Sequence, residues 1–278
     1  MPPKARPDDF FGRFREIVSD PLNALIERVP AAGIVDSTHV TLHNGNRVPV
    51  AGPGAYYGDF SAILVVNRGV HEPLEEYVFQ ETLRHVPEAP VMLELGAYWG
   101  HYSMWLKKAR PRARTILVEP EAANLAAGKS NFALNKMQGE FYQAFVGRGS
   151  FEVDRFLASV GLDRLDILHS DIQGFESEML DGAASLLSRH GAGYVFISTH
   201  SQELHQDAIT RLRAHGYRVE ATADFDHETT SFDGLVFATS PAVPAVFSDF
   251  APLGREQICD ASAAARMDYL ARALKSRP

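Results

Sequence analysis

The sequence lacks several features that would assign its class at once. Among 278 residues there is one cysteine, Cys259, which excludes an internal disulfide and favours a reducing compartment. The longest apolar runs, such as Ala62–Val66, are far too short to cross a bilayer. Residues 1–9 lack the apolar core of a secretory signal. A cytoplasmic protein without a membrane span is therefore expected.

Basic charge is also scarce. The chain has 27 Lys and Arg against 35 Asp and Glu, a formal net charge of −8. Without an extended Lys/Arg stripe it offers no electrostatic footprint for a phosphate backbone, so nucleic acid is not expected as a partner. Internal repeats and low-complexity tracts are absent too. The length suits one sizeable α/β core with an appendage.

The most informative feature present is a short apolar run that leads into an acidic residue and two glycines. In the segment VMLELGAYWG these are Glu94, Gly96 and Gly100. The spacing differs from the G-x-G-x-x-G loop of dinucleotide sites, which argues against a dinucleotide. A second strand pattern, residues 113–119, ends in Glu119, whose carboxylate is placed to accept hydrogen bonds from ribose hydroxyls. Together these features predict a site for S-adenosylmethionine.

Strand-like and helix-like patterns alternate from residue 91 to 240 at the pace of a doubly wound sheet. The link at residues 225–234 is too short for the crossover that parallel strands need, so the last two strands should form an antiparallel hairpin. We therefore predict an α/β fold with a doubly wound, seven-stranded, mostly parallel sheet and an antiparallel last strand. The predicted strands are residues 91–97, 113–119, 140–147, 165–171, 193–200, 217–223 and 234–240, with helices at 121–137, 175–189 and 202–215.

Two flanking regions are predicted to accompany this main domain. Residues 1–90 should form a helical and hairpin extension packed on residues 91–240, and residues 241–278 should form a loop followed by a helix at 261–275. The division is a prediction from composition and pattern alone.

Within the extension, a helical pattern over residues 8–29 is interrupted by Pro21, and the dipeptide Asn44-Gly45 predicts a β-hairpin turn. A further helix is expected at 73–86. The glycine-rich, aromatic segment 51–60 suits either a lid over a ligand or a plain turn. We favour the plain turn.

Four motifs make residues 91–240 similar to FkbM-type methyltransferases, which have the Rossmann-like class I methyltransferase fold. They are LELGAYWGHYS at 93–103, VEP at 118–120, LDILHSDIQGFE at 165–176 and SFDG at 231–234. The third motif is the most specific. Its usual form in the family is Asp-x-Glu-Gly-x-Glu, and here Gln173 replaces the first Glu, so that position carries no charge. The resemblance implies O-methylation of small molecules or sugars.

The expected cofactor site lies where the strand order of a doubly wound sheet reverses, between the first and fourth predicted strands. Glycines would let the backbone approach the methionine portion, and the following helix N-terminus would favour the cofactor carboxylate. Glu94 could hold the cofactor ammonium. The predicted cofactor-binding residues are Glu94, Gly96, Ala97, Tyr98, Gly100 and Glu119.

Asp171 ends the fourth predicted strand and His200 the fifth, and they form the predicted catalytic pair. A sulfonium already activates its methyl group, so alignment and exclusion of water matter most. A hydroxyl acceptor must also lose its proton, either to a base or through coordination to a cation. His200 could be that base. Alternatively, Asp171, His200 and a further ligand could hold a divalent cation such as magnesium, as in the metal-dependent sugar O-methyltransferases that the chain resembles.

Structural roles compete with these functional ones. Asp171 could cap the helix expected near Gly174. His200 could cap the next helix, although Thr199 and Ser201 are better candidates. Three further histidines lie near the predicted site. His205 could be a second ligand, but we favour a solvent-facing residue. His101 could contact the cofactor or the acceptor, but we favour structural roles for both His101 and His169.

These features predict a cytoplasmic S-adenosylmethionine-dependent O-methyltransferase that acts on a hydroxyl of a sugar or sugar-containing small metabolite. Two other classes stay open. A nucleotide-sugar-modifying, NAD-dependent oxidoreductase would require the last hairpin to be misread. A catalytically silent adenosyl-binding module is the other, and Gln173 is one hint of it.

Overall fold

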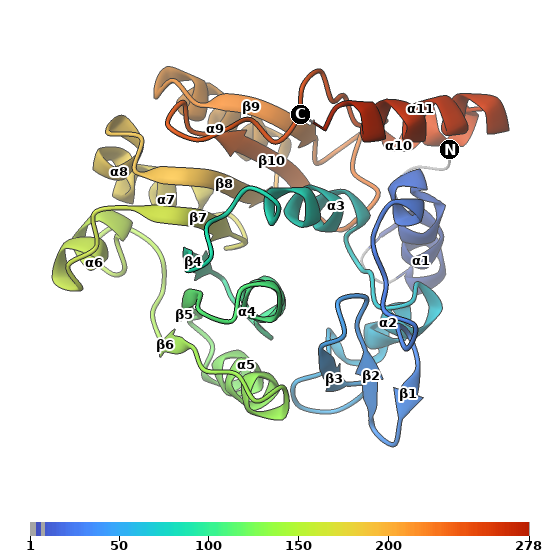
Figure 1. Cartoon of the computed structure of the whole chain (residues 1–278), viewed down its shortest axis with the longest axis horizontal. Helices are drawn as coiled ribbons and strands as arrows, with labels where there is room; N and C mark the ends of the chain where they lie inside the picture. Colours follow the sequence, from blue (N-terminus) through green and yellow to red (C-terminus); the bar gives the residue numbers. More distant parts are fainter. Residues whose placement is uncertain (1–3, 7–8, 278) are drawn as a thin grey trace.

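We describe the protein from a computed structural model, which defines residues 4–6 and 9–277. Its centre is a seven-stranded sheet, and a small three-stranded sheet lies to one side (Figure 1). The strand order of the large sheet is β6-β5-β4-β7-β8-β10-β9. Its strands are β4 (Val91–Leu95), β5 (Arg114–Val118), β6 (Glu140–Tyr142), β7 (Leu165–Ser170), β8 (Ala192–Thr199), β9 (Arg218–Ala223) and β10 (Gly234–Thr239).

The order of these strands confirms the predicted fold class. Strand β4 pairs in parallel with both β5 and β7, so the chain winds outward in two directions from this point. Strand β10 inserts between β8 and β9 and runs antiparallel to both, which confirms the predicted final hairpin. This arrangement is the seven-stranded class I methyltransferase sheet. All seven predicted strands are present, but β6 ends at Tyr142, whereas its strand was expected to continue to residue 147.

Helices cover both faces of the sheet. In β8, Tyr194 and Phe196 enter one apolar core while Val195 and Ile197 enter the other, as expected for a strand buried on both faces. The first core contains residues of α3 (Pro73–Thr82), α4 (His101–Ala109) and α11 (Ala263–Lys275). The second contains residues of α6 (Val153–Ser159), α7 (Glu176–Gly182), α8 (Ala184–Ser188) and α9 (Gln202–Ala214).

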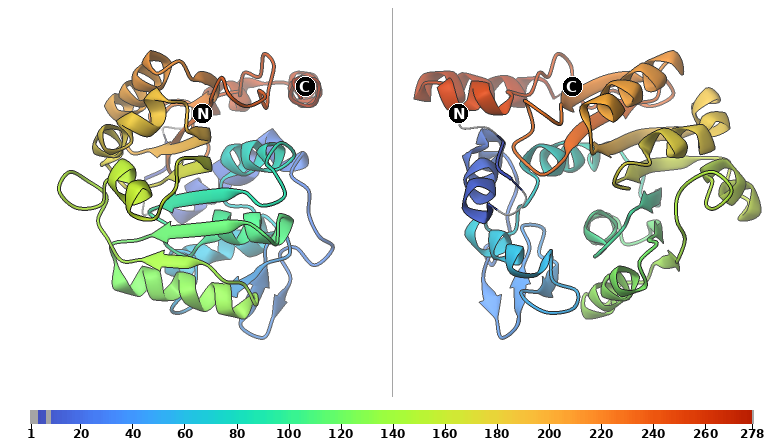
Figure 2. Two further views of the ribbon diagram at one scale, coloured as in Figure 1. Left: turned by 60° about the vertical axis from the view of Figure 1, so that its left-hand side comes forward. Right: turned by 180° about the vertical axis from the view of Figure 1, so that it is seen from behind.

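The N-terminal elements pack beside α4 and α5 (Ala122–Leu134) rather than standing apart (Figure 2). They are α1 (Phe10–Ser19), β1 (Val35–Asp36), β2 (His39–Thr41), β3 (Arg47–Pro49), η2 (Gly58–Ser61) and α2 (Ala62–Val66), whereas η1 (Pro21–Ala24) packs against α3 and α11. The side chain of Asn135, just after α5, accepts a hydrogen bond from the Arg47 amide and donates one to the Arg47 carbonyl, both at 2.8 Å. The small sheet is thereby joined to the main domain.

Several local expectations need correction. Helical structure after Pro21 is limited to the single 3-10 turn η1, because the Arg28 guanidinium donates to the carbonyls of Asn23 and Ile26 in place of helix amides. Residue 8, where the first helical pattern was expected to start, lies outside the described residues. The short helices α2, α6 and α10 (Arg255–Asp260) were not predicted. The hairpin turn at Asn44-Gly45 is confirmed.

Among the residues that the structure describes, no helix has the length and apolar character needed to span a membrane.

Candidate functional site

A cavity of about 520 Å³ opens at the carboxyl ends of β4, β7 and β8, where the strand order reverses. Its lining includes the predicted residues Glu94, Gly96, Asp171 and His200. A second cavity of about 440 Å³ is lined by Glu119 and the segment after β6. Both cavities share Tyr57, Gly96, Tyr98, Asp171 and Gln173, so they adjoin. The structure thus brings the residues predicted for cofactor and chemistry to one edge of the sheet.

The glycine loop is shaped by a close contact between two strand ends. Gly96 has a φ of +71°, and a Cβ at this position would lie 1.7 Å from the carbonyl oxygen of Asp171. The amides of Gly96 and Ala97 both donate to the carbonyl of Val118. Gly100 also has a positive φ, +78°, immediately before α4. Glycine at residue 96 is therefore required by the packing of the β4 loop against the end of β7.

Two carboxylates predicted to hold the cofactor are themselves held in place. Glu94 is buried, accepts a hydrogen bond from the Ser103 amide at 3.1 Å and has its pKa raised by burial. Glu119 accepts hydrogen bonds from the amides of Tyr98 and Glu121, each at 3.0 Å. A carboxylate has about four acceptor positions, so both groups keep capacity for a ligand.

The predicted pair Asp171 and His200 belongs to a larger cluster. His200 Nε2 lies 3.2 Å from Asp171 Oδ1 and 3.4 Å from Asp233 Oδ1, while His200 Nδ1 lies 2.5 Å from Glu176 Oε1. Glu176 is almost fully buried, whereas the Asp171 and Asp233 side chains are 32% and 20% exposed. One imidazole is therefore held by a buried carboxylate on one side and faces two cavity carboxylates on the other.

This surrounding charge shifts the pKa values of the cluster. Burial alone would lower the pKa of His200, but the hydrogen bonds to Asp171 and Glu176 and the charge of Asp233 raise it to about 11. Burial and the charge of Asp171 raise the pKa of Asp233 to about 7, against the opposing charge of His200. With this arrangement His200 is protonated at neutral pH and Asp233 titrates near neutrality.

Asp233 and Glu176 were not singled out from the sequence, although both lie in quoted motifs. Gly234 of β10 pairs with Thr199 of β8, so the residue before Gly234 lies beside the residue after Thr199. The predicted hairpin joined this strand to the preceding one and gave no register against β8, so the structure alone places Asp233 next to His200. Glu176 reaches His200 from the first residue of α7.

The glycine-rich segment 51–60 forms one wall of the site. Tyr57 lines both cavities, and its amide donates to the Tyr98 hydroxyl at 2.9 Å. The same hydroxyl donates to the carbonyl of Ala55 at 3.1 Å. Tyr57 itself has a positive φ of 45°. The segment is therefore more than the plain turn favoured from the sequence, because it encloses the cavity.

Neither of the helix-capping roles considered for Asp171 and His200 is present in the structure. Asp171 does not cap a helix, because α7 begins at Glu176 with Phe175 as its N-cap residue and no capping side chain. Ser201 caps α9 by accepting from the Leu204 amide, which leaves His200 free of that role.

The expectation of a solvent-facing His205 is wrong. It is 1% exposed, and its Nδ1 lies 3.0 Å from the Thr199 hydroxyl. The reason is helical periodicity, since residue 205 shares the inner face of α9 with the buried Ala208 and Leu212.

His169 contacts Glu75, with 2.6 Å between His169 Nε2 and Glu75 Oε1. Burial opposes its protonation, but the hydrogen bond to Glu75 outweighs this and raises the pKa of His169. His169 and His101 are both buried, and both line the larger cavity.

Comparison with known proteins finds a methyltransferase domain in part of the chain. The sequence profile of the methyltransferase FkbM domain matches residues 149–219. No curated protein matches the chain in sequence.

Among solved structures, the precorrin-6y C5,15-methyltransferase of Geobacter metallireducens GS-15 is similar with a TM-score of 0.45 and 17% identity, covering 59% of this chain and 85% of that one. The methyltransferase FkbM of Methylobacillus flagellatus KT has a TM-score of 0.44 and 18% identity, covering 64% of this chain and 53% of that one. TrmK of M. capricolum, solved with S-adenosylhomocysteine, has a TM-score of 0.42 and 11% identity, covering 71% of this chain and 82% of that one.

The strand order and the profile match carry the assignment, and these distant likenesses add no detail of activity. The matched segment contains Asp171, Glu176 and His200, three members of the cavity cluster. Residues 149–219 match the methyltransferase FkbM domain, and the sheet that contains them has the strand order of the class I methyltransferase fold.

Proposed function

We propose that the protein is an S-adenosylmethionine-dependent O-methyltransferase that methylates a hydroxyl of a sugar or sugar-containing small metabolite. The observation that carries the proposal is the junction of the two cavities at Asp171. One cavity offers a carboxylate and aromatic rings for a nucleoside, and the other holds the charged cluster of Asp171, His200 and Asp233.

The smaller cavity suits the adenosine portion of the cofactor. Glu119 lies at the end of β5, where its remaining acceptor capacity would serve the ribose hydroxyls. Phe145 and Phe175 are 44% and 36% exposed, and their ring centroids lie 4.5 Å apart. Exposed aromatic rings beside a concave surface are apolar contacts for a planar base. The methionine portion would then extend past Gly96 toward Glu94.

The larger cavity supplies the chemistry. In the transfer, the acceptor oxygen forms a bond to the methyl carbon, the carbon–sulfur bond breaks, and the sulfonium becomes a neutral thioether. The hydroxyl proton must leave at the same time. Because His200 is already protonated, we assign proton acceptance to Asp233, whose pKa of about 7 suits a general base at neutral pH. His200, held by Glu176, orients the two aspartates and balances their charge.

The same cluster also fits a divalent cation. Single ligand atoms of Asp171, His200 and Asp233 all lie within 4.8 Å of one another. Two carboxylates and one imidazole suit magnesium or a transition metal such as manganese. A bound cation would lower the pKa of a coordinated hydroxyl. The proton-acceptor and cation routes differ in their response to EDTA, which distinguishes them.

The walls of the larger cavity favour a compact acceptor that has both polar and apolar faces. Tyr56, Tyr57, Phe60, Trp99 and Phe232 contribute aromatic surface to the lining. Carboxylates stand among these rings and would accept hydrogen bonds from several hydroxyls. A sugar ring presents both kinds of surface, and about 520 Å³ is within the size range of small-molecule sites.

The test begins with titration calorimetry of S-adenosylmethionine and of NAD(H), repeated with EDTA and with magnesium. A screen of glycosylated metabolites follows, with S-adenosylhomocysteine release as the readout. Selective binding of S-adenosylmethionine together with transfer to a hydroxyl supports the proposal. Selective NAD(H) binding would indicate an oxidoreductase, and cofactor binding without transfer to any acceptor would indicate a silent binding module.

A variant separates binding from chemistry. Asp233→Asn preserves size and removes the proton acceptor, so we expect unchanged S-adenosylmethionine affinity and loss of transfer by about 10²–10⁴-fold. Retained transfer in this variant would show that Asp233 has no such role.

A further inference from the structure

A second cluster of polar side chains lies buried between the N-terminal hairpin and the main domain. His43 comes from the loop between β2 and β3, Glu76 from α3, and His101 from the first residue of α4. They are 1%, 0% and 2% exposed, respectively. None of the three belongs to the cluster of Asp171, His200 and Asp233, and the proposed methyl transfer uses none of them.

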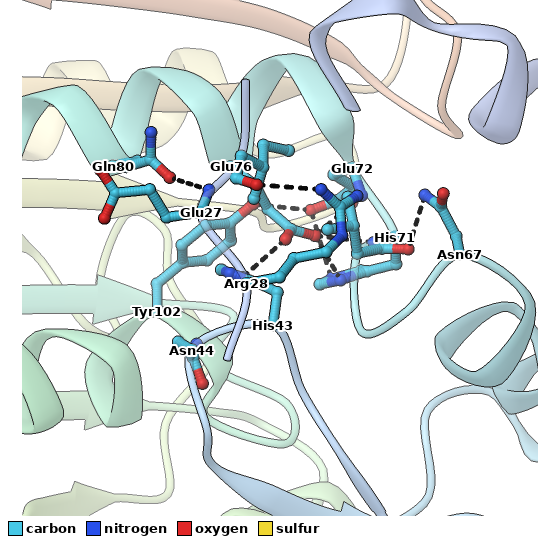
Figure 3. A network of polar contacts seen from close by, with 12 residues as sticks. Glu27, Arg28, His43, Asn44, Asn67, His71, Glu72, Glu76, Gln80 and Tyr102 are labelled. Carbon is cyan, nitrogen blue, oxygen red and sulfur yellow. Dashed lines mark hydrogen bonds and ion pairs between the residues drawn. The ribbon is translucent and has the colours of Figure 1, made fainter. Parts of the chain in front are cut away.

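Glu76 is the centre of this cluster. Its Oε2 lies 2.8 Å from His43 Nε2, and its Oε1 lies 2.7 Å from His71 Nδ1. Figure 3 shows His43 and His71 directed toward Glu76 from different segments of the chain. The Oε1 atom also accepts the amides of His71 and Glu72 at 2.7 and 3.0 Å. These contacts fix the carboxylate with Oε2 turned to His43.

Three imidazole nitrogens beside Glu76 lack the hydrogen-bond partners that buried polar atoms normally have. Neither ring nitrogen of His101 forms a hydrogen bond with any part of the chain that the structure describes, and the same is true of His43 Nδ1. The His101 ring lies 5.9 Å from the His43 ring and 4.7 Å from the His71 ring, centroid to centroid. Most buried polar atoms in native proteins are satisfied, so this group of orphaned nitrogens points to something that binds them.

We propose that His43, Glu76 and His101 bind a divalent transition-metal ion, with Zn²⁺ as the ion that their chemistry fits best. One ligand atom from each residue lies within 4.8 Å of the others. Two imidazole nitrogens and one carboxylate oxygen form a donor set that zinc uses with bonds of about 2.0–2.2 Å. At those bond lengths tetrahedral ligand atoms are about 3.4 Å apart, so the side chains need to close by a small movement.

His71 acts as a positioning residue in this site. It contacts the carboxylate oxygen that faces away from His43, in the manner of groups that orient a metal ligand from behind. His71 and His101 also line the larger cavity, which gives an ion a path to the site. A bound ion would connect the hairpin to α3 and α4, and so join the N-terminal extension to the helix that follows the glycine loop.

The experiment uses the full chain carrying Asp171→Asn and Asp233→Asn, which removes the other cluster that could bind metal. The protein is purified without chelators, stripped with EDTA and titrated with Zn²⁺ alone, and the metal is measured by mass spectrometry. We expect about one tightly bound Zn²⁺ per chain and a rise in Tm on zinc addition. Absence of bound zinc in this protein would overturn the proposal.

Variants then assign the ligands. His43→Ala and Glu76→Gln should each lose the stoichiometric zinc, and His71→Phe should weaken affinity by about 10–100-fold. The exposed His227→Ala serves as the matched control and should retain zinc. Unchanged zinc content in both ligand variants would also overturn the proposal.

Co²⁺ absorption provides a measurement that does not depend on whether the His43 and Glu76 variants fold. In the Asp171→Asn, Asp233→Asn protein, Co²⁺ should give the visible bands of a low-symmetry site with nitrogen ligands. A spectrum identical to that of aqueous Co²⁺ would contradict the assignment.

Discussion

Replacing Gly96 with alanine should disrupt the site more than any other single methyl group added in the glycine loop. The new Cβ would lie 1.7 Å from the carbonyl oxygen of Asp171, whereas real Cβ contacts are essentially never shorter than 3.0 Å. The β4 loop and the end of β7 must therefore separate by about 1.3 Å, the difference of those two distances. This movement displaces the backbone of Asp171 and widens the junction of the two cavities.

The loss of folding stability expected for Gly96→Ala has two sources. The φ of +71° at Gly96 costs a non-glycine residue about 1–2 kcal/mol. The forced displacement of packed backbone adds about 1–3 kcal/mol, as in overpacked cores. We therefore expect the free energy of unfolding to fall by about 2–5 kcal/mol. A misplacement of about 1 Å at a reacting group lowers the rate by about 10²-fold.

Gly161→Ala is the matched control, since Gly161 has a φ of +67° but no atom within 4 Å of the added Cβ. It should lose only the conformational part, about 1–2 kcal/mol, and keep its cofactor affinity. Urea unfolding followed by circular dichroism measures the first quantity, and S-adenosylmethionine titration the second. If both variants lost equal stability and bound the cofactor equally well, the steric reasoning would be refuted.

Three further outcomes are expected. Burial raises the pKa of Asp20 above its ordinary value of 3.8, so the folded protein holds a proton that the unfolded chain has already lost. The stability that comes from this protonated Asp20 is lost as the pH rises through the folded-state pKa. Asp20→Asn should therefore reduce the decline of stability with rising pH in urea unfolding from about pH 4 to 8; an unchanged pH profile would contradict this. Asn135→Ala removes the paired hydrogen bonds to Arg47 and should cost about 1–3 kcal/mol in the same assay, whereas a loss well below this would show that the pairing contributes little. Tyr98→Phe leaves the amide of Tyr57 without its acceptor, so cofactor affinity should fall by about 5–30-fold in calorimetry, and undiminished affinity would show that this wall does not order the site.

The main sheet could be predicted because each of its strands is encoded locally. Apolar residues on both faces, short lengths and the brief link before β10 are visible without any knowledge of distant contacts. The glycine loop could be predicted for the same reason, because the end of an apolar strand pattern followed by two glycines is enough to locate it. Residues at the ends of β4, β7 and β8 were therefore expected to converge, and they do.

The remainder of the site depends on contacts between distant segments. Tyr57 reaches the cavity through packing of the N-terminal extension on Tyr98, which no local pattern indicates. The burial of His43 beside Glu76 likewise arises only when the hairpin meets α3. The short helices were missed because five to seven residues give too little periodicity to recognise. The division at residues 90 and 240 stays a prediction.

The position of β10 has a consequence for how activity is acquired during folding. Strand β10 is the last strand of the sheet in the sequence, yet it occupies the place between β8 and β9, and Asp233 immediately precedes it. The glycine loop and Glu119 follow β4 and β5, two strands that pair with each other and precede β10 in the sequence. A refolding chain can thus assemble its cofactor pocket before β10 inserts, but not its charged cluster. Recovery of cofactor binding should precede recovery of methyl transfer, and the interval between them would report the insertion of this one strand.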